Sequence, residues 1–98
     1  MKADAILLNA NDNVVTTVNG ACKGAKVSYY SGKELLSIDT TSEIPPCHKI
    51  ALTLINKGDK VIKYGEIIGV ATETIAKGGW VSHNNIISVP RNYDEEMK

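Results

Sequence analysis

Apolar positions along this 98-residue chain alternate with polar ones or form short β-branched runs, a pattern typical of strands and not of amphipathic helices. Glycine, asparagine and proline residues separate the runs and favour turns between them. The segment 49–55 also suits a single helical turn, because it is rich in Ala and Leu. The predicted strands lie at residues 5–8, 14–18, 27–30, 33–41, 49–55, 61–62, 67–71, 80–81 and 86–89.

A seven-residue pattern recurs: an apolar residue, two residues, glycine, two residues and a β-branched residue. It is clearest at 55–61 and 75–81, with weaker copies at 21–27 and 44–50. In the 44–50 copy Cys47 stands at the glycine position. The turn there either avoids a positive φ or tolerates it under strain.

Many short strands joined by glycine turns, with almost no helix, predict one compact, irregular, mainly β domain. We assign it to residues 1–90, because Pro90 ends the pairing of the last predicted strand. Residues 91–98 are a polar tail. A domain of this size folds with a margin of only a few kcal/mol, which a partner surface could supplement.

The formal net charge is zero, with 11 basic and 11 acidic residues and no cationic run. Neither nucleic acid nor an anionic membrane is therefore an expected partner. No segment approaches the length of an apolar membrane span, and residues 1–10 lack the apolar stretch of a signal peptide. We expect a cytoplasmic protein whose partner is another protein or a small molecule.

Two cysteines, Cys22 and Cys47, lie far apart in the sequence and have no neighbours at zinc-site spacing. We interpret them as reduced, small packing residues, since structural disulfides are rare in the cytosol.

The chain resembles, from Ala5 to Val89, the SAF (antifreeze-like, β-clip) domain of the altronate and galactarate dehydratase family; the segment from Ile44 to Asn85 is the most specific part, and an Asp-Asn-Val element at residues 12–14 also matches. The residues that carry it are Ile44, Pro45, His48, Lys49, Ala51, Leu52, Ile55, Lys57, Gly58, Val61, Ile62, Lys63, Tyr64, Gly65, Ile68, Gly69, Ala71, Ile75, Gly78, Trp80, Val81 and Asn85. The resemblance implies a β-clip fold and the small subunit of a sugar-acid dehydratase, inactive without a large catalytic subunit.

Dehydration of a sugar acid removes a proton next to a carboxylate and expels a β-hydroxyl, so it needs a base, an acid and positive charge. His48 could exchange a proton near neutral pH, and Lys49 could neutralise a carboxylate; we name these two as the catalytic residues. A divalent metal, iron or manganese, is implied for the large subunit, and none for this chain alone. The candidate substrate-binding residues are Asp12, Asn13, His83, Asn84 and Asn85.

One departure from the family concerns the run Val-His-x-His-Asn, which reads Val-Ser-His-Asn-Asn at residues 81–85. Ser82 and Asn84 replace the two histidines, whereas Asn85 matches and His83 takes the intervening position. Substrate choice and the direct part of this chain in catalysis therefore stay open.

Other interpretations remain open as well. His48 could simply cap backbone groups, Asp12 and Asn13 could form an Asx turn, and Trp80 could pack in the core or at a subunit seam. The chain could be a non-catalytic module that binds a glycan or a protein, or the small subunit of a sulfolactate sulfo-lyase. Without its partner it could form homo-oligomers.

Overall fold

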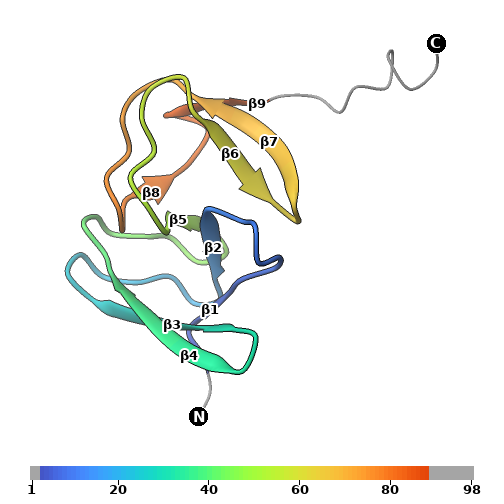
Figure 1. The fold of residues 1–98 in the computed structure, drawn as a ribbon. Coiled ribbons are helices and arrows are strands. Elements are labelled where there is room, and N and C mark those ends of the chain that lie inside the picture. Colours follow the sequence, from blue (N-terminus) through green and yellow to red (C-terminus); the bar gives the residue numbers. More distant parts are fainter. Residues whose placement is uncertain (1–2, 89–98) are drawn as a thin grey trace.

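The computed structural model describes residues 3–88, and the regular structure in this range is β-strand (Figure 1). This confirms the mainly β fold class. Within the described range the chain has no helix that could span a membrane. The strands are β1 (Ala5–Ile6), β2 (Val14–Thr17), β3 (Lys26–Ser31), β4 (Glu34–Asp39), β5 (Lys49–Ala51), β6 (Lys60–Lys63), β7 (Glu66–Ala71), β8 (Trp80–Val81) and β9 (Ile86–Ser88).

Hydrogen bonds join these strands into a six-stranded sheet, in the order β4-β3-β1-β2-β5-β8, and a three-stranded sheet, in the order β6-β7-β9. β1 and β3 run parallel, and the other neighbouring strands are antiparallel. In Figure 1 the β3–β4 hairpin lies at the bottom of the view and the β6–β7 hairpin at the upper right, with β2 and β5 between them. The central strands thus separate two hairpins.

The repeated sequence pattern forms the same turn in all four copies. Its fourth residue is left-handed each time, with φ of 80° at Gly24, 65° at Cys47, 91° at Gly58 and 85° at Gly78. The amide of the fifth residue donates to the carbonyl of the second at 2.8 to 3.3 Å. The copy at 44–50 therefore tolerates the positive φ without glycine.

Each turn also forms backbone hydrogen bonds with a residue that is distant in sequence. Gly58 N–H donates to the Ala71 carbonyl at 2.8 Å, and Ala71 N–H donates back to Asp59 at 2.9 Å. The turns at 21–27 and 75–81 hold Thr40 and Ala51 by the same two bonds. In the 44–50 turn, the His48 carbonyl accepts from Thr17 N–H at 2.9 Å. These hydrogen bonds satisfy backbone N–H and C=O groups that the short strands alone would leave unpaired.

The repetition divides the chain into two similar halves. In the first half, turns 21–27 and 44–50 flank the β3–β4 hairpin; in the second, turns 55–61 and 75–81 flank β6–β7. The first residues of each pair of turns bond to one another, Ala21 with Ile44 and Ile55 with Ile75. Each half is thus a hairpin closed at its base by two turns.

Gly78 is required by space as well as by its φ of 85°. A Cβ at this position would overlap the carbonyl oxygen of Asp39, at the end of β4. The Gly78 carbonyl accepts from Thr41 N–H at 3.0 Å, so this turn packs directly on the first half. Gly24 and Gly58, in contrast, face open space.

The core consists of two clusters that share the central strands. Alternation places successive residues of β2 and β5 on opposite faces, so Val14 and Ala51 enter one cluster and Val15 and Ile50 the other. The buried members of the first are Val14, Ala51, Ile55, Val61, Ala71, Ile75 and Val81, and those of the second are Ala5, Val15, Val27, Ile38, Ile44 and Ile50.

Several predicted details were wrong. The strand expected at 49–55 ends at Ala51: the bond from Leu52 N–H to the Asn13 carbonyl, at 2.8 Å, is the last between β2 and β5, and the chain bends at residues 52–53. The strand expected at 5–8 ends at Ile6. Cys22 and Cys47 are free thiols, but both are exposed and neither packs in the core. Pro90 and the tail at 91–98 lie outside the described residues.

We expect Cys47→Gly to raise the free energy of unfolding by about 0.5–1 kcal/mol, because it removes the steric cost of a left-handed side chain. Cys22→Gly is the matched control. Cys22 is exposed and has no positive φ, so that change should lower stability through lost backbone entropy. Urea unfolding of both variants measures this, and equal effects would contradict the assignment of strain to Cys47.

Candidate functional site

His48 is partly buried at the end of the 44–50 turn, next to Trp80 of β8. The indole Nε1–H of Trp80 donates to His48 Nδ1 at 3.0 Å, and the two ring centroids lie 5.4 Å apart with 69° between the planes. Thr17, which is buried, donates both its N–H and its hydroxyl to the His48 carbonyl, at 2.9 and 3.1 Å. The backbone and ring of His48 are therefore held, and Nε2 is the ring nitrogen that remains for a ligand.

Lys49 follows His48 in sequence but points to the other face of the sheet. It is the first residue of β5, and it lies opposite Thr16 and Val81 in the neighbouring strands. Desolvation by burial lowers the pKa of the Lys49 ammonium, and the charge of Lys63 lowers it further. The predicted pair thus does not present two side chains to one ligand from a single loop.

Asp12 is buried and its carboxylate binds backbone amides. It accepts from Asn9 N–H at 3.1 Å, from Tyr64 N–H at 3.1 Å and from Gly65 N–H at 2.8 Å. Tyr64 and Gly65 form the tip of the β6–β7 hairpin and are both left-handed, with φ of 60° and 71°. Asp12 therefore ties this turn to the loop before β2.

Asn13 extends the pairing of β6. Its Oδ1 accepts from Ile62 N–H at 2.8 Å, and its Nδ2 donates to the Lys60 carbonyl at 2.9 Å. The Asx turn considered for this loop is made instead by Asn9, whose Oδ1 accepts from Asn11 N–H at 2.9 Å. The polar atoms of Asn13 that could meet a substrate are thus engaged with backbone.

The loop at 82–85 is organised by Asn85. The Asn85 side chain accepts from Ser82 N–H at 2.9 Å and donates to the Trp80 carbonyl at 2.7 Å. Ser82 is buried, and its hydroxyl accepts from Asn84 N–H at 3.2 Å. The side chains of His83 and Asn84 are exposed at the tip.

The structure divides the predicted site residues between two ends of the central strands. The loop at 82–85 leaves β8 beside His48, because β5 and β8 are antiparallel and Lys49 lies opposite Val81. Asn13 lies beside Leu52 at the other end of β5. From His48 to Leu52 the chain advances by four residues, which in extended conformation correspond to about 13 Å. One small molecule bound at His48 could reach the 82–85 loop more readily than Asn13.

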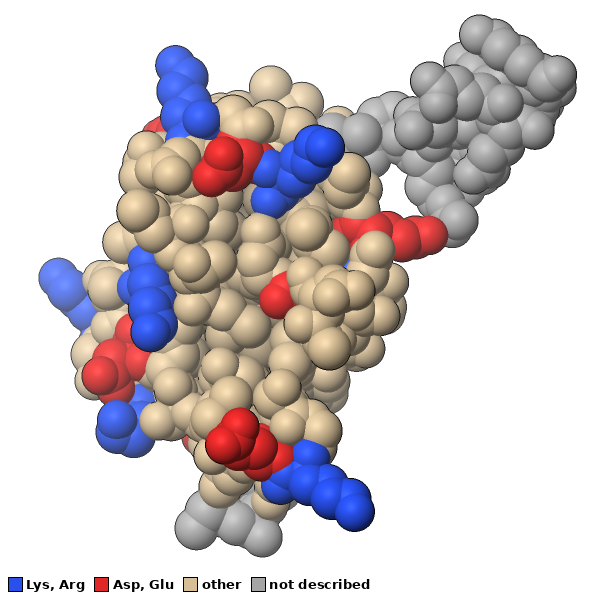
Figure 2. Space-filling view, viewed as in Figure 1, with Lys and Arg blue, Asp and Glu red and all other residues tan. Residues whose placement is uncertain are grey.

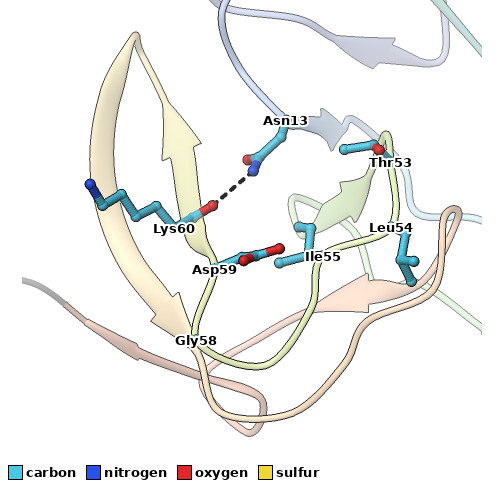
Figure 3. Close-up of a pocket in the computed structure, with 7 residues that line it drawn as sticks. All are labelled: Asn13, Thr53, Leu54, Ile55, Gly58, Asp59 and Lys60. Atoms are coloured by element: carbon cyan, nitrogen blue, oxygen red, sulfur yellow. Dashed lines mark hydrogen bonds between the residues drawn. The ribbon is translucent and has the colours of Figure 1, made fainter.

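Three open hollows lie on the surface of the described residues. One of about 390 Å³ lies beside β6, and Figure 3 shows the bond from Asn13 to Lys60 at its wall. Two others measure about 310 and 360 Å³. Asn13 is the predicted site residue that lines one of these three. The 390 Å³ hollow is lined by Asn13, Thr53, Leu54, Ile55, Gly58, Asp59 and Lys60.

Charged side chains are scattered over the face that Figure 2 shows, mostly toward its edge, and an acidic side chain interrupts the largely uncharged middle. Lys26 and Asp39, whose charged atoms lie 3.2 Å apart, form an exposed ion pair across β3 and β4. Residues 3–88 contain no group of three or more His, Cys, Asp or Glu side chains that could hold a metal ion.

Trp80 was expected to pack in the core or at a subunit seam, and it does pack against the second core cluster. Its bond to His48 was not anticipated. No local sequence signal could have found this bond, because it depends on the pairing of β5 with β8, which places Trp80 opposite Ile50 and near His48.

Comparison with known proteins matches residues 3–89 to the family described as altronate/galactarate dehydratase SAF domain. The chain belongs to this family. Its relatives include the galactarate dehydratase (L-threo-forming) of Escherichia coli strain K12, which is 33% identical over 82 residues, or 84% of this chain. The altronate dehydratases of Bacillus subtilis strain 168 and of Escherichia coli strain K12 are 32% and 36% identical over 80 residues, or 82% of this chain.

The SAF domain chain spans only 15% of the length of each of these dehydratases. The remaining sequence of the relatives has no counterpart in the compared residues. Family membership therefore applies to the SAF domain. The dehydratase activity of the full-length relatives does not follow for this chain from that membership.

We expect Asp12→Ala to lower the free energy of unfolding by about 2–3 kcal/mol, because it leaves three backbone donors without their acceptor. Asp59→Ala is the control. The Asp59 carboxylate accepts from the Asn56 amide in an exposed turn, so its loss should cost under about 1 kcal/mol. Urea unfolding of both variants measures the difference. An Asp12 variant as stable as the control would show that the three bonds of the Asp12 carboxylate do not stabilise the fold.

The lowered pKa of Lys49 makes its charged form a cost to folding below that pKa. Between the folded-state pKa and the higher unfolded-state pKa only the unfolded chain holds the Lys49 proton, so this cost shrinks across that window and is gone above the unfolded-state value. Lys49→Met should therefore be stabilised relative to wild type at pH 7 and lose this advantage in alkaline solution. Thermal unfolding from pH 7 to 10.5 measures it, with the exposed Lys60→Met as control; parallel profiles would refute it.

Proposed function

We propose that this SAF domain works as the small subunit of a carbohydrate-acid dehydratase of the altronate and galactarate type. The family match over residues 3–89 carries the proposal. In this assignment a large catalytic subunit completes the active site, and this chain contributes the turn that bears His48. The expected location is the cytoplasm, and the substrate is a sugar acid.

A partial site agrees with the shape of the chain. A complete small-molecule site usually encloses most of its ligand, whereas the hollows here are open and do not include His48. A partner surface over the turn at 44–50 and the loop at 82–85 would bring His48, His83 and Asn84 against one ligand. Asn85 would support this surface from behind through its bonds to Ser82 and Trp80.

Lys49 would act from the other face of the sheet. Its partly buried ammonium lies near a second cation, Lys63, and a substrate or partner carboxylate there would relieve the repulsion between them. The divalent metal belongs to the large subunit in this proposal.

A non-catalytic binding module is the second candidate. Two observations favour it: Ser82 and Asn84 stand where the family pattern has histidines, and the polar atoms of Asp12 and Asn13 are occupied by backbone. A sulfolactate sulfo-lyase subunit would use the same residues and release sulfite instead of water. The exposed Ile6, Tyr64 and Ile87 would favour homo-oligomers when the partner is absent.

Co-expression with a large dehydratase subunit tests the proposal. We expect co-purification, and formation of 2-keto-3-deoxy acids from a panel of hexonates and hexarates only when both chains are present. His48→Ala should lower kcat/KM at least about 100-fold while the complex survives. Lys33→Ala, at the exposed tip of the β3–β4 hairpin, is the control.

A complex that forms and turns over equally well with His48→Ala would favour the binding module. Turnover that does not require this chain would overturn the small-subunit role. Sulfite among the products would instead identify the sulfo-lyase.

A further inference from the structure

The bond between Trp80 and His48 determines where the imidazole hydrogen lies. The indole Nε1–H can only donate, so His48 Nδ1 must accept it at 3.0 Å through its lone pair. A neutral imidazole carries one hydrogen, which is then on Nε2. An imidazolium carries hydrogens on both nitrogens and cannot accept from Trp80. The bond therefore selects the neutral ring with Nε2–H.

The reverse ring orientation would lose this bond. A half-turn of the imidazole about its bond to Cβ exchanges Nδ1 with a carbon atom, which would place a C–H group against the indole N–H. The bonded orientation is thus the one that satisfies the half-buried indole donor.

Both partners are fixed from behind, so the bond is not a chance contact between mobile side chains. The Trp80 carbonyl accepts from Asn85 Nδ2 at 2.7 Å, and its ring packs against the second core cluster. On the other side, Thr17 donates twice to the His48 carbonyl. Asn85, Trp80 and His48 form one connected series from the 82–85 loop to the 44–50 turn.

We propose that Trp80 is a positioning residue that holds the neutral His48 imidazole in the tautomer with its hydrogen on Nε2, so that His48 serves the substrate as a hydrogen-bond donor and not as a base. The inference rests on the proposed function. Nε2–H can donate to a carboxylate or enolate oxygen of a sugar acid, where negative charge develops as the α-proton leaves. It cannot accept that proton, because Nε2 already carries one. The base must then come from another group, such as one in the large subunit.

The tautomer can be measured on the purified chain itself. With ¹⁵N-labelled histidine, two-bond ¹H–¹⁵N correlations distinguish Nε2–H from Nδ1–H, and His83→Gln assigns the two histidines. We expect Nε2–H for His48 at pH 8, and a mixture of tautomers in Trp80→Phe. An Nδ1–H spectrum for wild-type His48 overturns the inference.

Two substitutions at His48 test its role in the assembled enzyme. The amide of His48→Gln can donate from a position close to Nε2 but cannot act as a base. We expect His48→Gln to retain kcat/KM within about tenfold of wild type, whereas His48→Ala falls about 10²–10³-fold, as for the loss of one donor to a developing oxyanion. Equal losses in the two variants would identify a base and refute the donor role.

Trp80→Phe keeps an aromatic ring in the same place but removes the donor. We expect a loss of about tenfold, mainly in kcat, and little further loss when Trp80→Phe is added to His48→Gln, because Trp80 acts only through the imidazole. Equal losses in both backgrounds would mean that Trp80 merely supports the fold, and would overturn its positioning role.

The two levels of the proposal fail differently. If turnover does not depend on this chain, the proposed function fails and the donor role falls with it, whatever the spectra show. If turnover depends on the chain but His48 carries its hydrogen on Nδ1, the proposed function stands and the inference fails.

Discussion

The left-handed turn, repeated four times, is the constraint on which the rest of this structure depends. Strands of two to six residues have too few ladder bonds to hold a sheet together, and the turns supply the missing ones by clipping distant backbone groups. The conformation itself costs about 1–2 kcal/mol for a residue with a side chain, which explains glycine at three of the four positions. Cys47 is the exception, and its turn is the one that carries His48. The strained backbone of Cys47 therefore lies next to His48, the candidate site residue with a titratable ring.

Most of the fold could be predicted from the sequence because each of the four turns follows the same seven-residue pattern. This pattern located all four turns, and alternation located the strands between them. The ends of strands were less accurate, as at Ala51, because the chain bends at residues 52–53 although Leu54 and Ile55 continue the apolar pattern. The exposure of Cys22 and Cys47 was missed for a similar reason, since both occupy turn positions that point to solvent.

The candidate site was only partly predictable. Family resemblance identified the polar residues, but not how they divide between the two ends of the central strands. Adjacent residues of a strand face opposite sides, so His48 and Lys49 separate as soon as Lys49 joins β5. Asp12 and Asn13 could not be distinguished from ligand-binding residues by sequence, because their partners, Gly65 and Ile62, lie about 50 positions away. The bond of Trp80 to His48 could not be predicted for the same reason, since only the pairing of β5 with β8 brings the two residues together.

The two halves of the chain use the same turn but not the same side chains, and the contact between Trp80 and His48 depends on that difference. Residues 44–50 and 75–81 occupy equivalent turns, yet their fifth and sixth residues are His-Lys in one and Gly-Trp in the other. If both turns carried the same residues, neither an indole donor nor an imidazole acceptor would face the other across β5 and β8. The contact thus arises where two turns of one backbone conformation differ in sequence: one supplies the imidazole and the other its hydrogen-bond donor. A change that made the two turns alike would keep their backbone and lose the contact.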